Sequence, residues 1–273
     1  MNFDFHYPKE KALSKFIEFY YTGSINKFYF AYPHYNNPLS FIKNSEVTIY
    51  KYGIDLESRP DYTSKIIVAK KNVFPIYINP INEIKEFCIV FKPYGLSQFL
   101  ENPITSLKED KPVITLVEFE DFYTKNKGFF QMENSEKIDV IELYLMNRLF
   151  LKNNLEQIIS SIDYFNNENI KITDIISKTL ISLKTYNRSF NLNCGVSPVK
   201  FKRIIHFRNA IEKIKDNETE KLKEIAIDCG YYDQAAFNNE FKKMSQLLPK
   251  DFFKKMNILL ENKIYFNCSP KKK

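Results

Sequence analysis

The sequence has 273 residues and a formal net charge of +7, a length that fits one large domain or two domains of ordinary size. Its 25 Phe and 18 Tyr, within 44% hydrophobic residues, exclude a disordered or collagen-like chain. No apolar run approaches the roughly 18 residues of a membrane-spanning helix, and the start lacks the basic-then-apolar order of a secretory signal. We therefore expect a folded cytoplasmic protein without a membrane partner.

The charge is distributed unevenly along the chain. Residues 1–166 carry 19 basic and 21 acidic side chains, a net charge of −2, whereas residues 167–273 carry 21 and 12, a net charge of +9. A basic segment attached to a near-neutral one is typical of proteins that bind an anionic polymer. Because Lys outnumbers Arg 35 to 5, part of this charge can reflect the composition of the source. The charge favours nucleic-acid binding without establishing it.

Residues 16–94 consist of short runs of aromatic and β-branched residues separated by Pro, Asn and Gly, a pattern that is typical of strands. Several such strands in a row indicate a barrel or a sandwich. The predicted strands are FIEFYY (16–21), KFYFAY (27–32), EVTIYKY (46–52), KIIVA (65–69) and EFCIVF (86–91).

Two amphipathic helices are predicted next, over residues 138–151 and 155–165. An apolar stripe on a helix can be buried against the same chain or against a second copy of it. For the first helix the choice stays open, whereas packing within the chain is slightly favoured for the second. A homodimer would form through residues 138–166. The stripes consist of Ile138, Ile141, Leu145 and Leu149 in the first helix, and of Ile158, Ile159 and Ile162 in the second.

Residues 222–249, LKEIAIDCGYYDQAAFNNEFKKMSQLLP, have the pattern of a helix-turn-helix. An apolar face that includes Ile225 and Ala226 predicts a short helix, and Gly230 permits a tight turn. Asp233 is a typical N-cap for a second helix, which carries two Phe residues one turn apart. The outward positions of this second helix are polar, as contacts with base edges and phosphates require.

A looser copy of this pattern occupies residues 172–198, ITDIISKTLISLKTYNRSFNLNCGVSP. Ser182 takes the N-cap role of Asp233, and each copy ends in a Pro eight residues after its second aromatic. Residues 199–215, VKFKRIIHFRNAIEKIK, predict a basic amphipathic helix between the copies. The repeated aromatic pairs, which we expect in the core rather than stacked on bases, are Tyr186 with Phe190 and Phe237 with Phe241.

On these residues the chain resembles the AraC/XylS family of bacterial transcription regulators over about residues 168–254. The segment GYYDQAAFNNEFKK (230–243) is similar to the most diagnostic stretch of that family. The resemblance implies two helix-turn-helix units joined by a long helix, with recognition helices in successive major grooves on one face of DNA. The first domain is similar to the sensor domain of one AraC subgroup through IVFKPYGLSQFL (89–100), which implies a cupin-like barrel followed by helices that dimerise or contact the DNA-binding domain.

The chain departs from the family pattern at five positions. Ile176 and Leu180 stand where the first unit usually has Ala and Gly, and Gln246 and Leu248 replace the usual Gly and Ser or Thr before Pro in the second. His206 occupies a usual Arg position. These differences affect the tilt of the first recognition helix and a phosphate contact near His206, so we expect the two units to differ in affinity for DNA.

Polar residues occupy the base-facing positions that the resemblance implies. Arg reads guanine bidentately, Asn and Gln read adenine, and Ala contacts a thymine methyl group. A solvated helical face is the alternative interpretation, and the aromatic framework weighs against it. A nonspecific DNA-binding protein could use Lys at most of these positions, so this alternative, like a protein-interaction module, is disfavoured. The implied base-reading residues are Lys184, Asn187, Arg188, Gln234, Ala235, Asn238 and Asn239, and the implied phosphate contacts are Ser182, Lys202, Arg203, Asp233, Lys242 and Lys243.

A cupin-type enzyme is the rival class, because such a barrel can hold a metal. The histidines His6, His34 and His206 form no HxH or HxxxH pair, whereas a catalytic metal usually needs about three protein ligands. Cys88 and Cys194 lack a neighbouring His or Arg that would lower the thiol pKa, so we expect packing residues rather than methyl-accepting ones. No GxGxxG, P-loop or GxSxG motif occurs. We expect no enzyme, no metal and no cofactor.

Together these patterns predict an α+β protein with an N-terminal β-rich, cupin-like barrel or sandwich with trailing helices, and a C-terminal all-α double helix-turn-helix domain. The expected segments are a regulatory domain (1–135), linker or dimerisation helices (136–166), a DNA-binding domain (167–260) and a tail (261–273). The predicted function is sequence-specific transcription regulation, modulated by a small-molecule effector or by dimerisation. The expected partners are double-stranded DNA and, for an activator, RNA polymerase.

Overall fold

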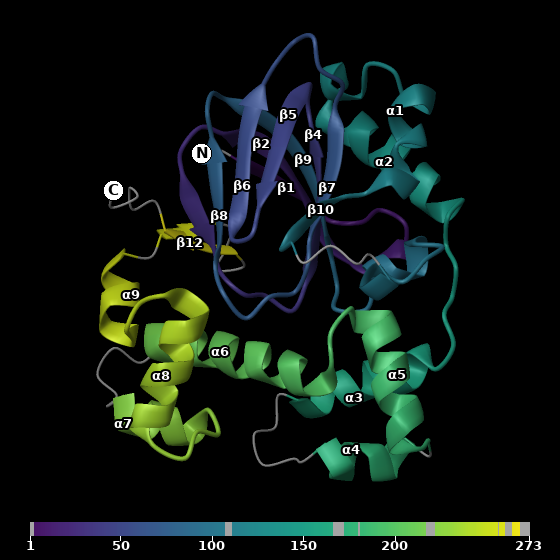
Figure 1. Cartoon of the computed structure of the whole chain (residues 1–273). Helices are drawn as coiled ribbons and strands as arrows, with labels where there is room; N and C mark the ends of the chain where they lie inside the picture. Colours follow the sequence, from purple (N-terminus) through teal and green to yellow (C-terminus); the bar gives the residue numbers. More distant parts are fainter. Residues whose placement is uncertain are drawn as a thin grey trace.

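The computed structural model describes residues 3–106, 111–165, 172–179, 181–216, 222–255, 257–259 and 264–267. Two β-sheets lie at one end of the molecule and the helices from α3 onward lie at the other (Figure 1). The first sheet has the order β1 (Phe3–His6), β2 (Ile17–Ile25), β9 (Ile84–Phe91), β4 (Asn37–Ile42), β7 (Lys65–Ala69) and β10 (Val113–Thr115). The second has the order β11 (Asn257–Leu259), β12 (Ile264–Asn267), β3 (Tyr29–Ala31), β8 (Ile76–Pro80), β6 (Gly53–Ser58) and β5 (Ser45–Tyr50).

Strands β2, β3, β5, β7 and β9 confirm the five predicted strands. Strands β4, β6 and β8 were not predicted, because their segments contain Asn, Pro, Gly or Asp, which are typical of turns. These strands form because their neighbours supply pairing and burial, which local sequence preference does not report. The result is the expected β-rich N-terminal part, built from two sheets.

The first sheet is the middle of three layers. Side chains alternate between the two faces of a strand, so Phe87 and Ile89 of β9 pack on one face, while Glu86 and Cys88 lie on the other. The first face packs against helices α1 (Asp121–Lys125) and α2 (Asn134–Met146), which cover the sheet in Figure 1. The second face looks toward the second sheet. The largest fully buried rings of the helix-facing core are Tyr20, Phe41, Phe87, Phe91, Phe99, Phe119, Phe122 and Phe129.

The apolar stripe of α2 is buried within a single chain. Ile138, Ile141 and Leu145 are at most 2% exposed and belong to the core that covers the first sheet. A dimer through this stripe, one of the two open interpretations, is therefore wrong, because the stripe already has its partner. The helix itself begins at Asn134, earlier than predicted, with a capping box formed by Glu133 and Glu136.

A buried carboxylate ties α2 to the start of the chain. Glu142 is 3% exposed, and its two oxygens accept hydrogen bonds from the backbone N–H groups of Lys9 (2.8 Å) and Glu10 (3.0 Å). The Tyr20 hydroxyl donates to the same carboxylate at 3.1 Å. These donors satisfy the charge, so its burial is a structural feature of the fold.

The C-terminal part is helical, as predicted. The long helix α6 spans the predicted segment 199–215 (Figure 1). Among the described residues, no helix is long and apolar enough to cross a membrane. The helices are α3 (Leu155–Phe165), α4 (Ile172–Thr179), α5 (Leu183–Cys194), α6 (Pro198–Asp216), α7 (Leu222–Asp228), α8 (Gln234–Ser245) and α9 (Pro249–Lys255).

Helix α3 packs with the C-terminal helices. Ile158 and Phe165 share a core with Phe190 of α5 and Phe201 of α6, and the Phe165 ring lies 5.6 Å from each of these two rings. This core confirms the prediction that the stripe packs within the chain. The domain boundary expected at residue 166 therefore falls between α3 and the helices against which α3 packs.

Buried polar contacts join the two parts. The ammonium group of Lys71, which is 4% exposed, donates to the backbone oxygen of Cys194 (2.8 Å) at the end of α5, to that of Pro93 (3.0 Å) and to Asn37. Gln98 donates to the Asn193 side chain at 3.0 Å. The N-terminal part thus satisfies the Cys194 carbonyl at the C-terminal end of α5, one of the groups that a helix leaves without partners.

The C-terminal residues add strands to the second sheet, which corrects the expected tail over residues 261–273. Strand β11 pairs antiparallel with β12, and β12 pairs antiparallel with β3, with Phe266 opposite Ala31 and Asn267 opposite Phe30. The terminal Lys residues of the expected tail lie outside the described residues. The chain therefore returns from the helical part to the sheet.

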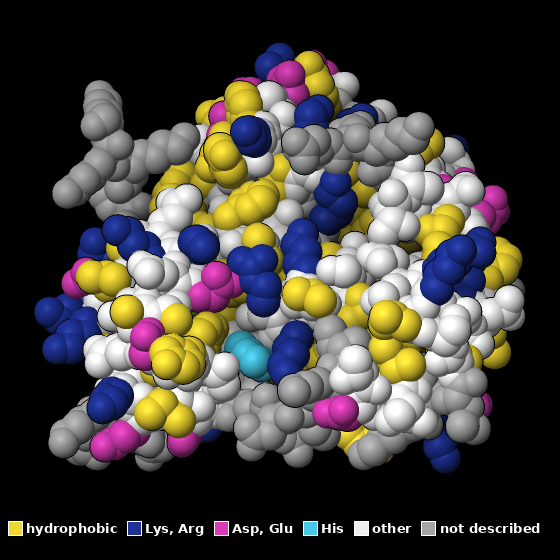
Figure 2. Space-filling model, turned by 60° about the horizontal axis from the view of Figure 1, so that its bottom comes forward, with side chains coloured by type: hydrophobic (Ala, Val, Ile, Leu, Met, Phe, Trp, Pro, Cys, Tyr) yellow, Lys and Arg dark blue, Asp and Glu magenta, His cyan; other side chains and the backbone are white. Residues whose placement is uncertain are grey.

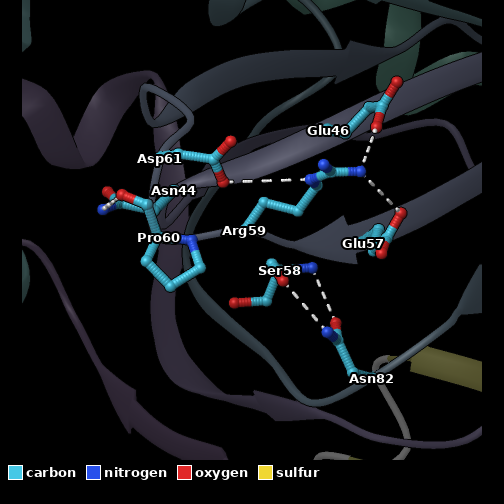
Figure 3. A network of polar contacts seen from close by, with 8 residues as sticks. All are labelled: Asn44, Glu46, Glu57, Ser58, Arg59, Pro60, Asp61 and Asn82. Atoms are coloured by element: carbon cyan, nitrogen blue, oxygen red, sulfur yellow. Dashed lines mark hydrogen bonds and ion pairs between the residues drawn. The ribbon is translucent and has the colours of Figure 1, made fainter.

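An ion-pair cluster holds one end of the second sheet (Figure 3). The Arg59 guanidinium lies 3.5 Å from Glu46, 3.7 Å from Glu57 and 3.9 Å from Asp61. Asn82 accepts from the backbone N–H of Ser58 at 2.6 Å and donates to its carbonyl at 3.0 Å. Arg59 is 41% exposed, so this cluster is a surface clamp on the β5–β6 hairpin that stabilises the fold only modestly.

Candidate DNA-binding surface and cavity

Each predicted recognition helix begins with the predicted cap. Ser182 accepts a hydrogen bond from the backbone N–H of Thr185 at 3.2 Å, and Asp233 accepts one from that of Ala236 at 2.7 Å. Both caps have extended backbones, as N-cap residues require. The structure thus begins α5 and α8 where the sequence predicts them.

Left-handed residues lie in the turn before α8 and directly after both recognition helices. Gly230 has φ +75° in the turn between α7 and α8, as predicted, and Gly195 has φ +74° after α5. After α8, Gln246 has φ +61°, a conformation that residues other than Gly adopt at a cost. Gln246, where the resemblance implies Gly, thus takes the left-handed conformation that favours Gly.

Helix α6 connects the two helix-turn-helix units through their cores. Phe201 and Ile205 belong to the core of the first unit, with Tyr186 and Phe190. Further along α6, Phe207, Ala210 and Ile211 belong to the core of the second unit. One helix therefore fixes the relative position of both units. The second core also contains the predicted core pair Phe237 and Phe241, together with Ile225 and Ala226.

The predicted base-reading residues lie on the outer surface of α5 and α8. In α5, Lys184 and Arg188 are exposed and Asn187 is half-buried. In α8, Ala235 and Asn239 are exposed, and Gln234 and Asn238 are half-buried. The Asn238 side-chain oxygen is buried without a hydrogen-bond partner among the described residues, so this residue is less free to reach a base than Asn239.

The predicted phosphate contacts fall into two groups. Lys242 and Lys243 are exposed at the end of α8. Arg203 of α6 instead pairs with Glu240 of α8 at 2.6 Å, and the Lys243 ammonium lies 3.9 Å from the same carboxylate. Arg203 therefore also fastens α8 to α6. Lys202 is half-buried.

His206 does not supply the positive charge of the Arg that the family usually has there. Burial, aided by the charge of Lys202, lowers the pKa of His206 to about 4. The imidazole is therefore neutral at pH 7. Its ring lies 6.1 Å from that of Tyr231, so it packs between α6 and the second unit.

The helical end of the molecule is basic. Figure 2 shows Lys and Arg side chains gathered across the middle of the face on which this end comes forward, with fewer acidic side chains beside them. A basic face with polar side chains on two capped helices has the composition of a DNA-contacting surface.

A cavity of about 510 Å³ lies between the two sheets and reaches α6. In the first sheet, residues that alternate with those of the helix-facing core line its walls, among them Ile42 and Ile67, and Ile78 lines it from the second sheet. At the other end it is bordered by Arg208 and Glu212 of α6. A space inside the N-terminal part thus touches the helix that carries both DNA-binding units.

One buried carboxylate lines this cavity. Glu86 of β9 is 4% exposed, and burial raises its pKa to about 7. The Tyr21 hydroxyl donates to Glu86 Oε1 at 3.4 Å, and Oε2 has no hydrogen-bond partner among the described residues. Sequence analysis missed Glu86, although a single Glu in the apolar strand segment EFCIVF was a visible signal.

The three histidines come from different segments of the chain. His6 lies in β1, His34 before β4 and His206 in α6. Burial raises the pKa of the Cys88 thiol, and raises that of Cys194 to about 12, so both thiols are protonated at neutral pH. Cys88 and Cys194 are buried and free of disulfides, in agreement with the expected packing role.

Known proteins resemble this chain in sequence over one segment and, more distantly, in structure. A search of curated proteins gives no match. Among solved structures, ToxT from Vibrio cholerae is 13% identical, covering 92% of this chain and 98% of its own with a TM-score of 0.44. Wild-type ToxT from Vibrio cholerae strain SCE256 with bound unsaturated fatty acid is 16% identical, covering 85% and 93% with a TM-score of 0.42.

The match to a protein family is confined to the helical part. Residues 176–255 match the family described as a helix-turn-helix domain. This segment contains α5 to α9 and therefore both predicted recognition helices. It agrees with the resemblance expected for residues 168–254. Residues 176–255 of this chain are therefore similar to that helix-turn-helix domain family.

Proposed function

We propose that this protein is a sequence-specific DNA-binding transcription regulator whose affinity for DNA depends on the state of its N-terminal cavity. The observation that carries the proposal is the placement of α5 and α8, two capped helices with polar outer surfaces, on the single helix α6. A shared rigid helix fixes the separation of two recognition helices, as binding in successive major grooves requires. In this proposal the protein acts on DNA in the cytoplasm and performs no catalysis.

Specific reading of bases would be divided between the two helices. Arg188 of α5 and Asn239 of α8 are exposed, and their side chains suit guanine and adenine, respectively. Lys184, Asn187, Gln234, Ala235 and Asn238 complete the proposed reading set. Lys202, Lys242 and Lys243 would contact phosphates, as would backbone N–H groups at the helix starts capped by Ser182 and Asp233. Arg203 would contribute mainly by fixing α8 through Glu240.

The cavity is positioned to influence the second unit. Strand β3 contributes Tyr29 and Ala31 to the cavity wall. The neighbouring residues Phe30 and Tyr32 pack against the core of the second unit, where the Tyr32 ring lies 4.7 Å from that of Phe252. A ligand that binds one arrangement of this strand better than another would shift the DNA-binding units accordingly.

Selection of bound fragments from genomic DNA tests the proposal. Purified full-length protein is incubated with genomic fragments and competitor DNA at near-physiological salt, and the bound fragments are sequenced. We expect a shared motif of two half-sites one helical turn apart. Random fragments whose recovery disappears as salt rises would contradict sequence-specific binding.

A further inference from the structure

The cavity between the sheets is lined by apolar and polar side chains from both sheets and from α6. Its walls combine Ile, Leu and Val with Phe and Tyr rings and several polar side chains, and the cation among its described lining residues, Arg208, comes from α6 at one end. Glu86 lies on β9 within the sheet. An apolar cavity with a few placed polar groups is the usual form of a small-molecule site, in which the polar groups select the ligand.

Glu86 presents an acceptor that the protein leaves unused. Its Oε2 is buried and has no hydrogen-bond partner among the described residues. The groups that face it are the Tyr21 hydroxyl from β2, the Ser40 hydroxyl from β4, the Cys88 thiol on the same face of β9, and Tyr29 from the opposite sheet. None of them is a cation. A carboxylate in such a position is costly unless something compensates its charge.

A second unused acceptor lies near the other end of the cavity. Asn36 is 8% exposed, lines the cavity and has a buried side-chain oxygen without a partner among the described residues. It precedes β4, whose residue Pro38 is opposite Val90 of β9. Four residues of strand separate Val90 from Glu86, about 13 Å. Both unused groups are acceptors, which a ligand that carries a hydrogen-bond donor could satisfy.

We propose that the cavity binds an elongated apolar amine, whose ammonium group pairs with Glu86 and whose hydrocarbon part fills the space between the sheets. This inference rests on the proposed function in that the amine would be the effector. An ammonium group supplies both a donor and the missing positive charge. A hydroxyl group supplies the donor alone, and a carboxylate would place a second negative charge beside the first.

Three probes of equal chain length separate these chemistries. Octylamine, octan-1-ol and octanoate are titrated into the full-length protein by calorimetry at pH 8 without DNA. We expect octylamine to bind at least tenfold more tightly than octan-1-ol, and octanoate to bind more weakly than either. Octanoate binding as tight as that of octylamine would overturn the proposal.

The Glu86→Gln variant tests the role of the carboxylate. It should lose the tenfold preference for octylamine and bind octan-1-ol within threefold of the unsubstituted protein. Glu83→Gln, a change at an exposed carboxylate close by in sequence, is the matched control and should retain the preference. An unchanged preference in Glu86→Gln would refute the pairing. Should that variant fail to fold, the ranking of the three probes on the unsubstituted protein still decides.

The pH gives an independent readout on the unsubstituted protein. With a Glu86 pKa of about 7, the carboxylate is mostly ionised at pH 8 and mostly protonated at pH 6. Burial raises the pKa values of Tyr21 and Cys88, so these neighbours stay neutral at both values. Octylamine affinity should therefore fall about tenfold from pH 8 to pH 6. Equal affinity at both values would contradict the assignment to Glu86.

The two proposals can fail separately. Probe binding is measured without DNA, and motif selection is measured without a probe. Octylamine binding with the expected ranking but no DNA motif would support the amine site and contradict the regulator. A DNA motif with no amine preference would support the regulator and overturn the amine site.

Discussion

The carboxylate of Glu86, which the proposed ligand would bind, destabilises the fold when it is ionised. Burial raises its pKa from 4.5 to about 7, so between these values the folded chain binds more protons than the unfolded chain. The free energy of unfolding therefore falls as pH rises through this range. Above pH 7 the ionised side chain destabilises the fold by about 3 kcal/mol. A ligand amine that compensates the charge would recover part of this free energy.

The Glu86→Gln substitution should accordingly stabilise the protein in a pH-dependent way. We expect the variant to exceed the unsubstituted protein by about 2 to 3 kcal/mol in the free energy of unfolding at pH 8, because the buried charge is gone. At pH 4.5 the difference should be close to zero, since little of the native carboxylate is ionised. Urea unfolding followed by circular dichroism measures both. The same difference at both pH values would show that burial of charge is not the cause.

At the scale of helices and strands, the sequence identified the segments whose burial follows a local period. The predicted strand KIIVA and the predicted helix 155–165 match β7 and α3 at both ends. The two recognition helices were predictable because Ser182 and Asp233 act locally, each within three residues of its partner. The aromatic pairs that fill the two cores repeat in the sequence for the same reason.

The partner of each apolar stripe was not predictable in this way. The stripe of α2 packs on a sheet whose strands come from residues 3–115, and that of α3 packs on α5 and α6. A helical period reports that a face is buried but not by what. The cavity could not be predicted from a local period either, because its lining residues are spread along the chain from Glu18 to Glu212. Glu86 and Lys71 acquire their roles only when distant segments meet.

Substitutions of the proposed base-reading residues should weaken binding to the selected motif more than binding to unrelated DNA. We expect Arg188→Ala and Asn239→Ala each to weaken binding to the selected motif by about 1 to 3 kcal/mol, because each removes a side chain suited to a base edge. Binding to unrelated DNA should change much less. Fluorescence anisotropy with motif and scrambled duplexes at fixed salt measures both affinities.

Lys242→Ala is the matched comparison on α8, the helix that carries Asn239. Its exposed ammonium group is suited to a phosphate, so its loss should weaken binding to motif and scrambled DNA by similar factors and reduce the salt dependence. If Arg188→Ala and Asn239→Ala gave this same uniform loss, those residues would be phosphate contacts rather than readers of bases.

At the scale of the whole molecule, the two parts share structure rather than only a linker. Lys71 donates to the end of α5, and Tyr32 of the N-terminal part packs in the core of the second helix-turn-helix unit. Strand β3 lies between the cavity and that unit, with Tyr29 and Ala31 on one side and Phe30 on the other. A change in the cavity therefore has a direct physical route to α8 and α9, and DNA binding would change the cavity in return.

Strand β12 connects the second helix-turn-helix unit to the cavity wall through the chain itself. It follows α9 and pairs with β3, so that the second DNA-binding unit is fastened to the cavity wall by its own C-terminal segment. A variant that ends at Lys255 should leave β3 without this neighbour, because backbone groups on that side of β3 lose their partners. Hydrogen exchange of residues 27–32 should then become several-fold faster, as measured by mass spectrometry.

The exchange of residues 65–69 is the internal control for this variant. Strand β7 lies between β4 and β10 in the other sheet, so its amide groups keep their partners when the chain is shortened. Unchanged exchange in both segments would contradict the pairing of β12 with β3. Faster exchange in residues 27–32 alone would confirm that β12 protects β3, because β3 is the strand that the truncation exposes.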